Sequence, residues 1–341
     1  MLNVGTIGTS MITEQFIEAC QLSNLYHVKG IYSRSEANGK DLATIYQADY
    51  YTNELNNMLY DPEIDVVYIA SPNSLHFEQA MRAIQAGKHC IIEKPMFTSV
   101  EEWHEAHEQA KKMGVYIFEA AKHIHNRNYR RLKDLVKHKM EEREQPFLGA
   151  NFNLGQYSSR YVSYNHAMEK EEKPENIFNL EFAGGSLMDL GVYPIYVAVD
   201  LFGLPQTVRY NAMKGPNGVD LLGTIVLTYP DFQVPIFLSK AVHSILPSEI
   251  YIDDETIVIY DMTTIAKVDL INRQGDEATI ISYRPENQLY DQIVTFYEVL
   301  TKPDDLRLQL MYEDWKQLSL SVAQTMELLR KSAKIRFPFE K

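Results

Sequence analysis

Cysteines, basic charge and long apolar runs are all scarce in this chain. Only two cysteines, Cys20 and Cys90, occur among 341 residues, so the disulfide framework of a small secreted domain is excluded. No window reaches the roughly 18 apolar residues of a membrane span, and the N-terminus lacks a basic region followed by a long apolar stretch. We therefore expect a reduced, cytoplasmic protein without membrane contact.

Acidic residues outnumber basic ones, with 46 Asp and Glu against 33 Lys and Arg and a formal net charge of -13. Surfaces that bind nucleic acid concentrate Lys and Arg, so we expect no nucleic-acid partner, and a small-molecule ligand stays open. The hydrophobic content of 45% is typical of a globular protein. A chain of this length usually divides between cores, so we predict two domains.

Short apolar runs alternate with helix-like periodicity through the first 122 residues. The runs are continuously apolar, which is typical of parallel strands covered on both faces. The helix after the fifth run begins with a capping box, Ser99 and Glu102, and ends at Gly114. Residues 1–122 are therefore predicted to form a dinucleotide-binding Rossmann domain with a doubly wound parallel sheet. Its strands are expected at residues 2–7, 27–32, 49–51, 65–70, 89–93 and 115–120.

The pattern changes after residue 122. A helix is predicted at 126–142, and the stretch FLGANFNLGQY, which begins at Phe147, alternates like a half-exposed strand. The polar residues 166–181 are interpreted as a solvated loop, with a lid as the alternative.

Strand candidates without intervening helices follow. Turn residues at Pro230–Asp231, Asp253–Asp254 and Gly275–Asp276 indicate hairpins, so residues 123–341 are predicted to carry a mostly antiparallel open sheet with helices on one face. The strands are expected at residues 207–214, 221–229, 234–242, 249–254, 256–261, 266–272 and 279–284. Two closing helices, 286–302 and 310–332, can pack back on the first domain.

Residues 4–16, VGTIGTSMITEQF, have the shape of a strand that enters a helix through a glycine turn. Gly8 matches the first glycine of the dinucleotide-binding pattern G-x-G-x-x-G, whereas Ser10 and Thr13 stand at the other two glycine positions. Their hydroxyls could donate to a pyrophosphate beside the free N–H groups of the helix. An ordinary strand-to-helix turn with N-cap hydroxyls fits equally well. The predicted cofactor contacts here are Gly8, Thr9, Ser10, Met11 and Ile12.

Ser33 and Arg34 follow the second predicted strand. A carboxylate about 20 to 25 residues beyond the first glycine would bind the ribose 2′-hydroxyl of NAD, whereas an arginine suits a 2′-phosphate. This pair therefore favours NADP(H) over NAD(H). The alternative is a surface arginine in a polar loop.

Polar residues also follow the next strands, where ligands of open parallel sheets bind. Ser71, Pro72, Asn73 and His76 come after the strand at 65–70, and the Asn73 amide could reach a ribose or nicotinamide. Turn and cap roles are the alternative for this stretch.

The strand at 89–93 ends in Glu93 and Lys94. Desolvating an ammonium group is costly, so a lysine at this edge favours a ligand or a partner over a side chain that merely reaches solvent. Further along, Asp189 and Tyr193 stand four residues apart in GGSLMDLGVYP and can share a helical face. A buried helix with a satisfied Asp and Tyr is the alternative to a proton-transfer pair.

The segments VGTIGTSMI, IASPNSLH, IIEKP, YIFEAA and GGSLMDLGVYP, in this order, resemble the Gfo/Idh/MocA family of oxidoreductases (glucose-fructose oxidoreductase, inositol dehydrogenase and rhizopine catabolism). The resemblance implies a Rossmann domain joined to an open-sheet domain whose outer face forms a homodimer or homotetramer interface. It also implies Lys94 as the catalytic lysine of E-K-P, with Asp189 as the acid and Tyr193 as the proton-transfer residue.

Tyr193, where many members have histidine, is more similar to the dihydrodiol and xylose dehydrogenase branch, whose members use NADP. The stretch EAAKHIHNRNY departs from the aromatic-arginine segment common in the family, so the resemblance does not specify the substrate. His123 and His125 alternate like strand neighbours, and we interpret them as a polar pocket wall or plain surface, with no metal site. Substrate contacts are expected from Lys122, His123, Arg160, Asp189 and Tyr193.

The leading hypothesis is hydride transfer between a nicotinamide cofactor and a secondary alcohol or ketone of a sugar or cyclic polyol. Tyr193 would exchange the hydroxyl proton, Lys94 would lower the effective pKa of Tyr193, and Asp189 would orient both. A sensor of the same fold that binds a dinucleotide or sugar without catalysis is the alternative. A Schiff-base aldolase that uses Lys94 is a third reading.

Overall fold

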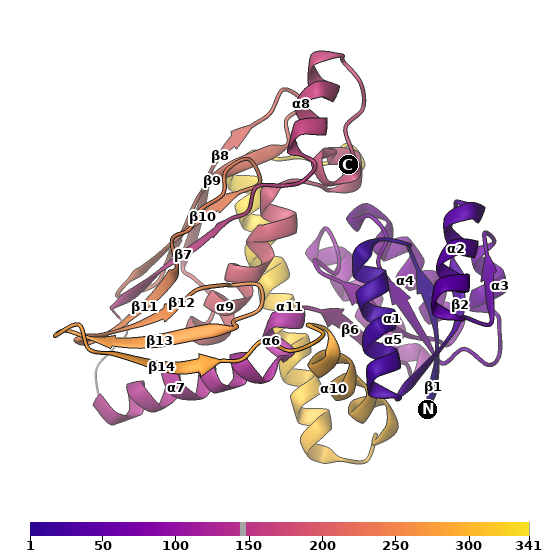
Figure 1. Cartoon of the computed structure of the whole chain (residues 1–341), viewed down its shortest axis with the longest axis horizontal. Helices are drawn as coiled ribbons and strands as arrows, with labels where there is room; N and C mark the ends of the chain where they lie inside the picture. Colours follow the sequence, from indigo (N-terminus) through magenta and orange to yellow (C-terminus); the bar gives the residue numbers. More distant parts are fainter. Residues whose placement is uncertain (144–147, 341) are drawn as a thin grey trace. The chain divides into compact units, whose positions relative to one another are not determined.

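The computed structural model describes residues 1–143 and 148–340 and divides into two compact units (Figure 1). The first unit consists of Met1–Lys122 and Pro285–Gln317, and the second of His123–Arg284 and Leu318–Lys341. The division at residue 122 coincides with the change of sequence pattern, but Pro285–Gln317 groups with the first unit instead of with the rest of the chain after residue 122.

The first unit contains a six-stranded parallel sheet in the order β3-β2-β1-β4-β5-β6, the doubly wound arrangement that the sequence predicts. The strands are β1 (Leu2–Ile7), β2 (Tyr26–Tyr32), β3 (Tyr50–Thr52), β4 (Val66–Ile69), β5 (His89–Glu93) and β6 (Ile117–Ala120). The helices between them are α1 (Met11–Ser23), α2 (Glu36–Tyr46), α3 (Leu55–Leu59), α4 (His76–Gln85) and α5 (Val100–Met113). The predicted cap of α5 is confirmed, because the Ser99 hydroxyl accepts a hydrogen bond from the Glu102 N–H (3.2 Å).

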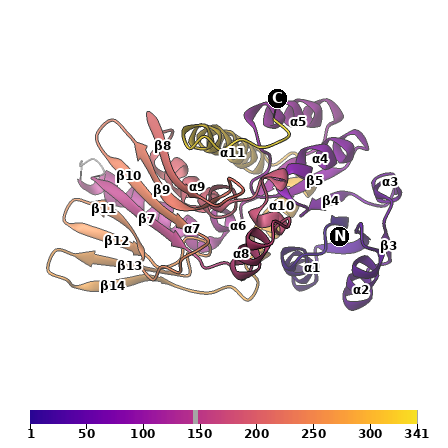
Figure 2. The ribbon, with the colours of Figure 1, turned by 90° about the horizontal axis from the view of Figure 1, so that it is seen from above.

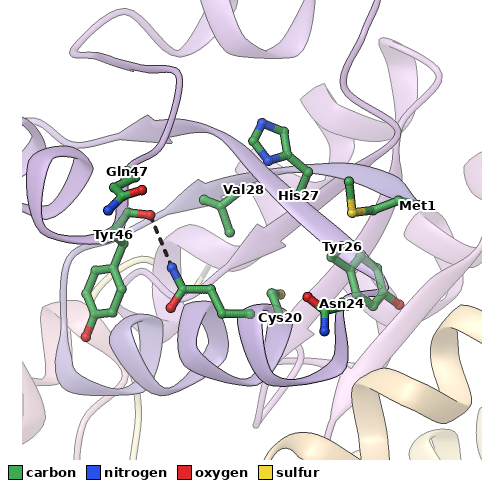
Figure 3. A pocket seen from close by; sticks show the side chains of 9 residues that line it. Met1, Cys20, Asn24, Tyr26, His27, Val28, Tyr46 and Gln47 are labelled. Atoms are coloured by element: carbon green, nitrogen blue, oxygen red, sulfur yellow. Dashed lines mark hydrogen bonds between the residues drawn. The ribbon is translucent and has the colours of Figure 1, made fainter.

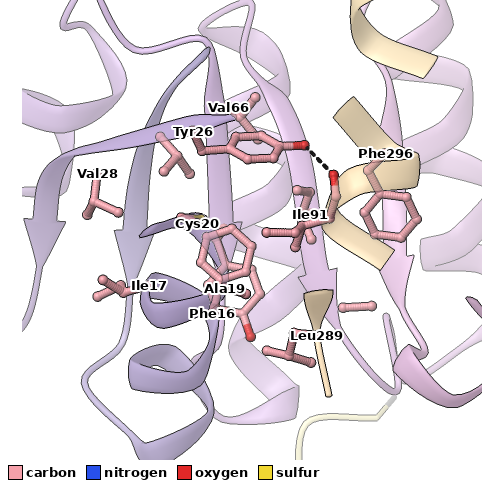
Figure 4. Close-up of a cluster of buried hydrophobic side chains, with 14 of the residues drawn as sticks. Phe16, Ile17, Ala19, Cys20, Tyr26, Val28, Val66, Ile91, Leu289 and Phe296 are labelled. Atoms are coloured by element: carbon pink, nitrogen blue, oxygen red, sulfur yellow. Dashed lines mark hydrogen bonds between the residues drawn. The ribbon is translucent and has the colours of Figure 1, made fainter. Parts of the chain in front are cut away.

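Helix α10 (Tyr290–Thr301) belongs to the core of the first unit, which explains the grouping of Pro285–Gln317 (Figure 4). Its Ile293 and Phe296 are fully buried in the same apolar cluster as Phe16 of α1. The Tyr26 hydroxyl donates to the Ile293 carbonyl (3.0 Å), so this contact satisfies a buried polar group as well. The core therefore combines chain segments that are nearly 300 residues apart in sequence.

The second unit carries an eight-stranded sheet in the order β14-β13-β12-β11-β7-β10-β9-β8. All neighbours are antiparallel except the parallel pair β7 and β10, so the predicted mostly antiparallel sheet is confirmed. The three predicted hairpin turns join β9 to β10, β11 to β12 and β13 to β14. The strands are β7 (Gly149–Gly155), β8 (Thr207–Lys214), β9 (Asp220–Thr228), β10 (Gln233–Ser239), β11 (Ser248–Ile252), β12 (Glu255–Ile259), β13 (Lys267–Asn272) and β14 (Glu277–Ser282). Phe147, where we expected β7 to begin, lies outside the described residues.

Helix α9 (Val192–Phe202) lies along one face of this sheet (Figures 1 and 2). It continues from a π-helical turn, Leu187–Gly191, and the Leu238 side chain of β10 packs against Gly191 of that turn. The remaining helices of this unit are α6 (Lys122–His125), which begins at the last residue of the first unit, α7 (Arg127–Arg143) and α8 (Tyr161–Glu169), while α11 (Leu306–Ser332) is shared between the units.

Within residues 1–143 and 148–340, one helical run, Leu180–Phe202, is long and apolar enough by length and composition to cross a membrane, with a mean hydropathy of 1.3, although the sequence analysis identified no such window. However, 89% of its apolar window is buried inside the protein. Burial of this kind is the property of a core helix packed against a sheet.

Two sequence predictions for the second domain were wrong in detail. His123 and His125 do not alternate along a strand, because they lie in the short helix α6. Residues 166–181 are not simply a solvated loop, because α8 and the turns after it form a small core of their own. Tyr164, Phe178 and Val219 are the buried members of that core.

Candidate active site

The turn between β1 and α1 requires glycine at position 8. Gly8 has a φ of 112°, and a β-carbon there would lie 2.6 Å from the Ala70 carbonyl oxygen, so only glycine fits. Ser10 occupies the N-cap of α1 and is exposed, and its hydroxyl caps no N–H among the described residues. The Ser10 hydroxyl and the positive end of α1 are therefore both available to a pyrophosphate, and the residues present fit the cofactor.

Thr13 does not contribute to this turn as we expected. Its side chain is fully buried, and its hydroxyl has no hydrogen-bond partner within residues 1–143 and 148–340. The third glycine of the dinucleotide pattern serves close packing of the helix on the strand, and Thr13 fills that space with a side chain. The predicted hydroxyl contact from Thr13 to a phosphate is thus wrong.

Ser33 and Arg34, in the loop after β2, differ in burial and therefore in role. Ser33 is buried, and its hydroxyl accepts a hydrogen bond from the Ser35 N–H (3.2 Å), so it shapes the loop. Arg34 is exposed at the edge where the parallel strands end, which we call the carboxyl edge. Its guanidinium is therefore accessible to a phosphate on a ribose that lies along this edge.

His76 holds two loops of the carboxyl edge together. The buried ring has Nε2 2.8 Å from the Ser71 carbonyl and Nδ1 3.2 Å from the carbonyls of Pro95 and Met96. Burial lowers the pKa of His76, and the three backbone carbonyls around its ring oppose that shift. Asn73 lies beside it in a single 3₁₀ turn, Asn73–Leu75, after Ser71 and Pro72.

Glu93 ends β5 and Lys94 follows it, as the sequence predicts, and the Lys94–Pro95 peptide bond is cis. Glu93 is buried and accepts a hydrogen bond from the Tyr68 hydroxyl (2.7 Å). Burial raises the pKa of Glu93, and the positive charges of Lys94 and Lys122 oppose that rise. Glu93 therefore lies close enough to Lys94 and Lys122 for their positive charges to act on its carboxyl group.

Lys122 follows β6 and donates a hydrogen bond to the Gln288 side chain. Gln288 lies just before α10, so the same segment that completes the core of the first unit also reaches its carboxyl edge. The predicted residues that the structure groups at this edge are Gly8, Ser10, Arg34, Asn73, Lys94 and Lys122.

In the second unit, two glycines and a buried carboxylate position the turn that carries Asp189. A β-carbon on Gly184 would lie 2.6 Å from the carbonyls of Asn176 and Ile177, and one on Gly185 would overlap Oδ1 of Asp220. The other oxygen of Asp220 accepts hydrogen bonds from the Leu187 N–H (2.7 Å) and the Tyr210 hydroxyl (2.8 Å). The GG pair thus allows the chain to pass close to Asp220, which anchors the start of the π-helical turn.

Asp189 lies within that turn and forms an ion pair with Lys240. The sequence analysis missed both Lys240 and Asp220. Lys240 directly follows β10, so the signal that drew attention to Lys94, a lysine after an apolar strand, was present here as well.

Tyr193 is in the first turn of α9 and is 8% exposed. Its ring packs edge-on against His123 with 4.8 Å between centroids, and Nε2 of His123 lies 3.1 Å from the Tyr193 carbonyl. His123 and His125 are both buried, so the reading of these histidines as plain surface is wrong. Among the described residues, no three His, Cys, Asp or Glu side chains are grouped as metal ligands.

Arg160 precedes α8 and pairs with Glu175, with 3.1 Å between Nε and Oε2. The Arg160 side chain is 60% exposed, so this pair is a weak surface contact that a ligand could replace. The structure thus places Lys94 and Lys122 in the first unit, and Asp189, Tyr193, His123 and Arg160 in the second.

Two hollows of the first unit lie away from the carboxyl edge. One, of about 230 Å³, opens where β2 begins, between the ends of α1 and α2, and the Gln21 amide donates to the Tyr46 carbonyl beside it (3.2 Å; Figure 3). The other, of about 750 Å³, lies between α5 and α11 near the start of β6. Because open parallel sheets bind dinucleotides where the strands end, neither hollow is the predicted cofactor site.

Comparisons with known families agree with this geometry. Residues 2–121 match the family model described as "Oxidoreductase family, NAD-binding Rossmann fold". Residues 151–258 match the model described as "GFO/IDH/MocA C-terminal domain". Together the two matches cover most of both units.

The chain is similar along its full length to scyllo-inositol 2-dehydrogenase (NADP(+)) IolU of Bacillus subtilis, with 34% identity over 338 residues and 99% of each chain covered. It is 36% identical over 273 residues to the uncharacterized oxidoreductase YgjR of Escherichia coli, with 80% of each covered. Its fold is similar to that of KijD10, a 3-ketoreductase from Actinomadura kijaniata solved with NADP and TDP-benzene. That superposition has a TM-score of 0.81, 19% identity and 97% of each chain covered.

Proposed function

Because the chain belongs to the Gfo/Idh/MocA family of oxidoreductases, we propose that it interconverts a secondary alcohol and a ketone of a cyclic polyol with NADP(H). The resemblance drawn from the sequence is thereby confirmed, and so is the assignment to nicotinamide-dependent oxidoreductases that act on CH–OH groups of sugars or polyols. The observation that carries the proposal is the full-length similarity to an NADP-dependent scyllo-inositol dehydrogenase.

The features of the first unit support the choice of NADP(H). Gly8 and Ser10 form a turn that fits a pyrophosphate, and Arg34 is exposed where a 2′-phosphate would lie. The bound nicotinamide supplies the hydride acceptor or donor. The side chains of the protein must then bind the substrate hydroxyl and exchange its proton.

We assign that task to Lys94, Asp189 and Tyr193. The ammonium of Lys94 would stabilise negative charge that develops on the substrate oxygen, and the phenol of Tyr193 would exchange the proton. Packing against His123 limits the orientations of the Tyr193 ring, which favours a fixed donor geometry. Lys122 and Arg160 are proposed to contact substrate hydroxyls.

The test is a panel of inositol isomers with NADP⁺ and NAD⁺, and of the corresponding cyclic ketones with NADPH and NADH. Turnover is followed as absorbance of the reduced nicotinamide. The proposal predicts the highest kcat/KM for a cyclic polyol or its ketone with the NADP couple. A protein that binds NADPH but oxidises it with no member of the panel would instead be the non-catalytic sensor. Borohydride trapping of a substrate carbonyl on Lys94 would indicate the aldolase reading.

Self-association is proposed to use the sheet face opposite α9. On β9 and β10, Ile225, Ile236 and Leu238 are buried on the helix side. The alternate residues include Val226 and Phe237, which are apolar and only partly buried. Light scattering should give a homodimer or homotetramer, and Val226→Lys should shift it toward monomer; a monomeric wild type would contradict this proposal.

The buried thiols of Cys20 and Cys90 suit the cytoplasm, which we propose as the compartment.

A further inference from the structure

Lys240 is a buried cation whose backbone is fixed on both sides. The residue is 3% exposed and directly follows β10. Its N–H donates to the Leu221 carbonyl (2.9 Å), and its own carbonyl accepts from the Ser158 N–H (2.9 Å). These hydrogen bonds fix the backbone position of Lys240. The contacts of its ammonium group then determine where the side chain points.

Among the residues that the structure describes, the ammonium of Lys240 contacts two groups. It donates to Oδ2 of Asp189 in an ion pair, and Nζ lies 5.6 Å from the centre of the Phe178 ring. Phe178 is fully buried in the small core that α8 builds with the turns after it. Lys240 therefore connects Asp189 to a rigidly packed part of the second unit.

The two partners differ in exposure. The Lys240 side chain is 4% exposed, whereas 30% of the Asp189 side chain remains exposed. A buried ammonium without a counter-charge is strongly unfavourable, so the ion pair with Lys240 constrains the Asp189 carboxylate to keep one oxygen directed at Nζ. The exposed part of Asp189 then faces outward from a fixed orientation.

The local backbone gives a second reason to treat this pair as functional. Asp189 lies in a π-helical turn, a form that is rare and is frequently found at functional sites. A buried ion pair is by itself weak evidence for a gain in stability, because desolvation offsets the attraction. The pair thus fits an orienting role better than a purely stabilising one.

We propose that Lys240 is a positioning residue for the reaction: it holds the carboxylate of Asp189 in the orientation that substrate turnover requires. This inference rests on the proposed function, since Asp189 is assigned to the proton-transfer set. Lys240 itself touches neither substrate nor cofactor in this account and acts through Asp189.

The kinetic test compares Lys240→Met, Asp189→Asn and the double variant. Lys240→Met should lower kcat about 10- to 100-fold with the KM for NADPH unchanged, because misplacement of a reacting group costs rate rather than cofactor affinity. The double variant should lose no more than Asp189→Asn alone, because Lys240 acts only through Asp189. Additive losses, or a Lys240→Met enzyme with wild-type kcat, would overturn the proposal.

Two further variants separate positioning from folding. Lys133 of α7 pairs with Asp200 (2.7 Å) but is 50% exposed, so Lys133→Met is the matched control and should keep wild-type kcat. Lys240→Arg retains the charge at a different distance, so it should keep the unfolding temperature of the wild type while kcat falls. Wild-type kcat in Lys240→Arg together with a large loss of stability in Lys240→Met would indicate a structural role and overturn the proposal.

A crystal structure of Lys240→Met, or of Lys240→Arg if the first variant does not fold, tests the same claim without turnover. The Asp189 side chain should leave its wild-type rotamer, and an unchanged rotamer would refute the inference. Failure of the proposed function is distinct, because it would appear as absent turnover in the wild type whatever the Asp189 rotamer does.

Discussion

Oδ1 of Asp220 occupies the space into which a β-carbon on Gly185 would project. Gly185 has a φ of 123°, which L side chains rarely adopt, and it directly precedes the turn that carries Asp189. The close approach lets the Asp220 carboxylate accept the Leu187 N–H (2.7 Å). The positive φ and the overlap with Asp220 therefore both require glycine at position 185. A larger residue there should lower the free energy of unfolding.

Gly185→Ala should destabilise the protein by about 2–5 kcal/mol, because backbone strain and overlap with Asp220 add together. Gly275 is the matched control: it also has a positive φ (88°), but no described atom lies within 4 Å of its β-carbon position. Gly275→Ala should cost only about 1–2 kcal/mol. Thermal unfolding of both variants checks this, and equal unfolding temperatures would contradict the role of Asp220.

The pKa of Asp220 predicts that the free energy of unfolding depends on pH. Burial raises the pKa of its carboxyl to about 6 from an ordinary value of 3.8. Between these values the unfolded chain has released the proton and the folded chain keeps it, so the free energy of unfolding falls as pH rises. The span corresponds to about 3 kcal/mol at 1.36 kcal/mol for each pKa unit.

Asp220→Asn removes this titration while other carboxyl groups remain. The wild type should thus lose stability relative to Asp220→Asn as pH rises from about 4 to about 6, and the difference should be level above that window. Urea unfolding at a series of pH values, followed by circular dichroism, measures the difference. A difference that stays constant across the whole range would show that Asp220 does not titrate there.

Arg34→Ala should weaken NADPH binding about 10- to 100-fold and leave NADH binding nearly unchanged, because only NADPH carries the 2′-phosphate. Ser10→Ala is the control, since the pyrophosphate is common to both cofactors, and it should weaken both about equally. Calorimetric titration gives all four affinities. Loss of NADH and NADPH affinity in equal measure for Arg34→Ala would place the guanidinium elsewhere on the cofactor.

The strands were predictable because their apolar runs carry a local signal. Continuous runs marked β1, β4 and β5, and polar turn residues marked the hairpins of the second unit. The grouping of Pro285–Gln317 with the first unit was not predictable in this way, because Ile293 and Tyr26 meet only through packing across 267 positions. The same holds for the core around Tyr164, whose partner Val219 is distant in sequence.

The candidate site likewise contains residues that a local sequence pattern identifies and residues that only the fold brings together. Gly8, Arg34 and Lys94 could be identified because the ends of parallel strands are known ligand positions. Lys240 and Asp189 are 51 residues apart, and no local pattern joins them. For Thr13, a hydroxyl at a glycine position suggests a ligand contact, whereas the structure buries its side chain completely.

The measurement that tests the account most directly is turnover of Lys94→Ala on the best polyol substrate, with NADPH affinity measured on the same preparation. We expect kcat to fall about 10²- to 10⁴-fold while the Kd for NADPH changes less than about twofold, because Lys94 acts on the substrate oxygen. Lys112→Ala, an exposed lysine of α5, should leave both unchanged. A Lys94→Ala enzyme with wild-type kcat would contradict the assignment of Lys94 to the chemistry.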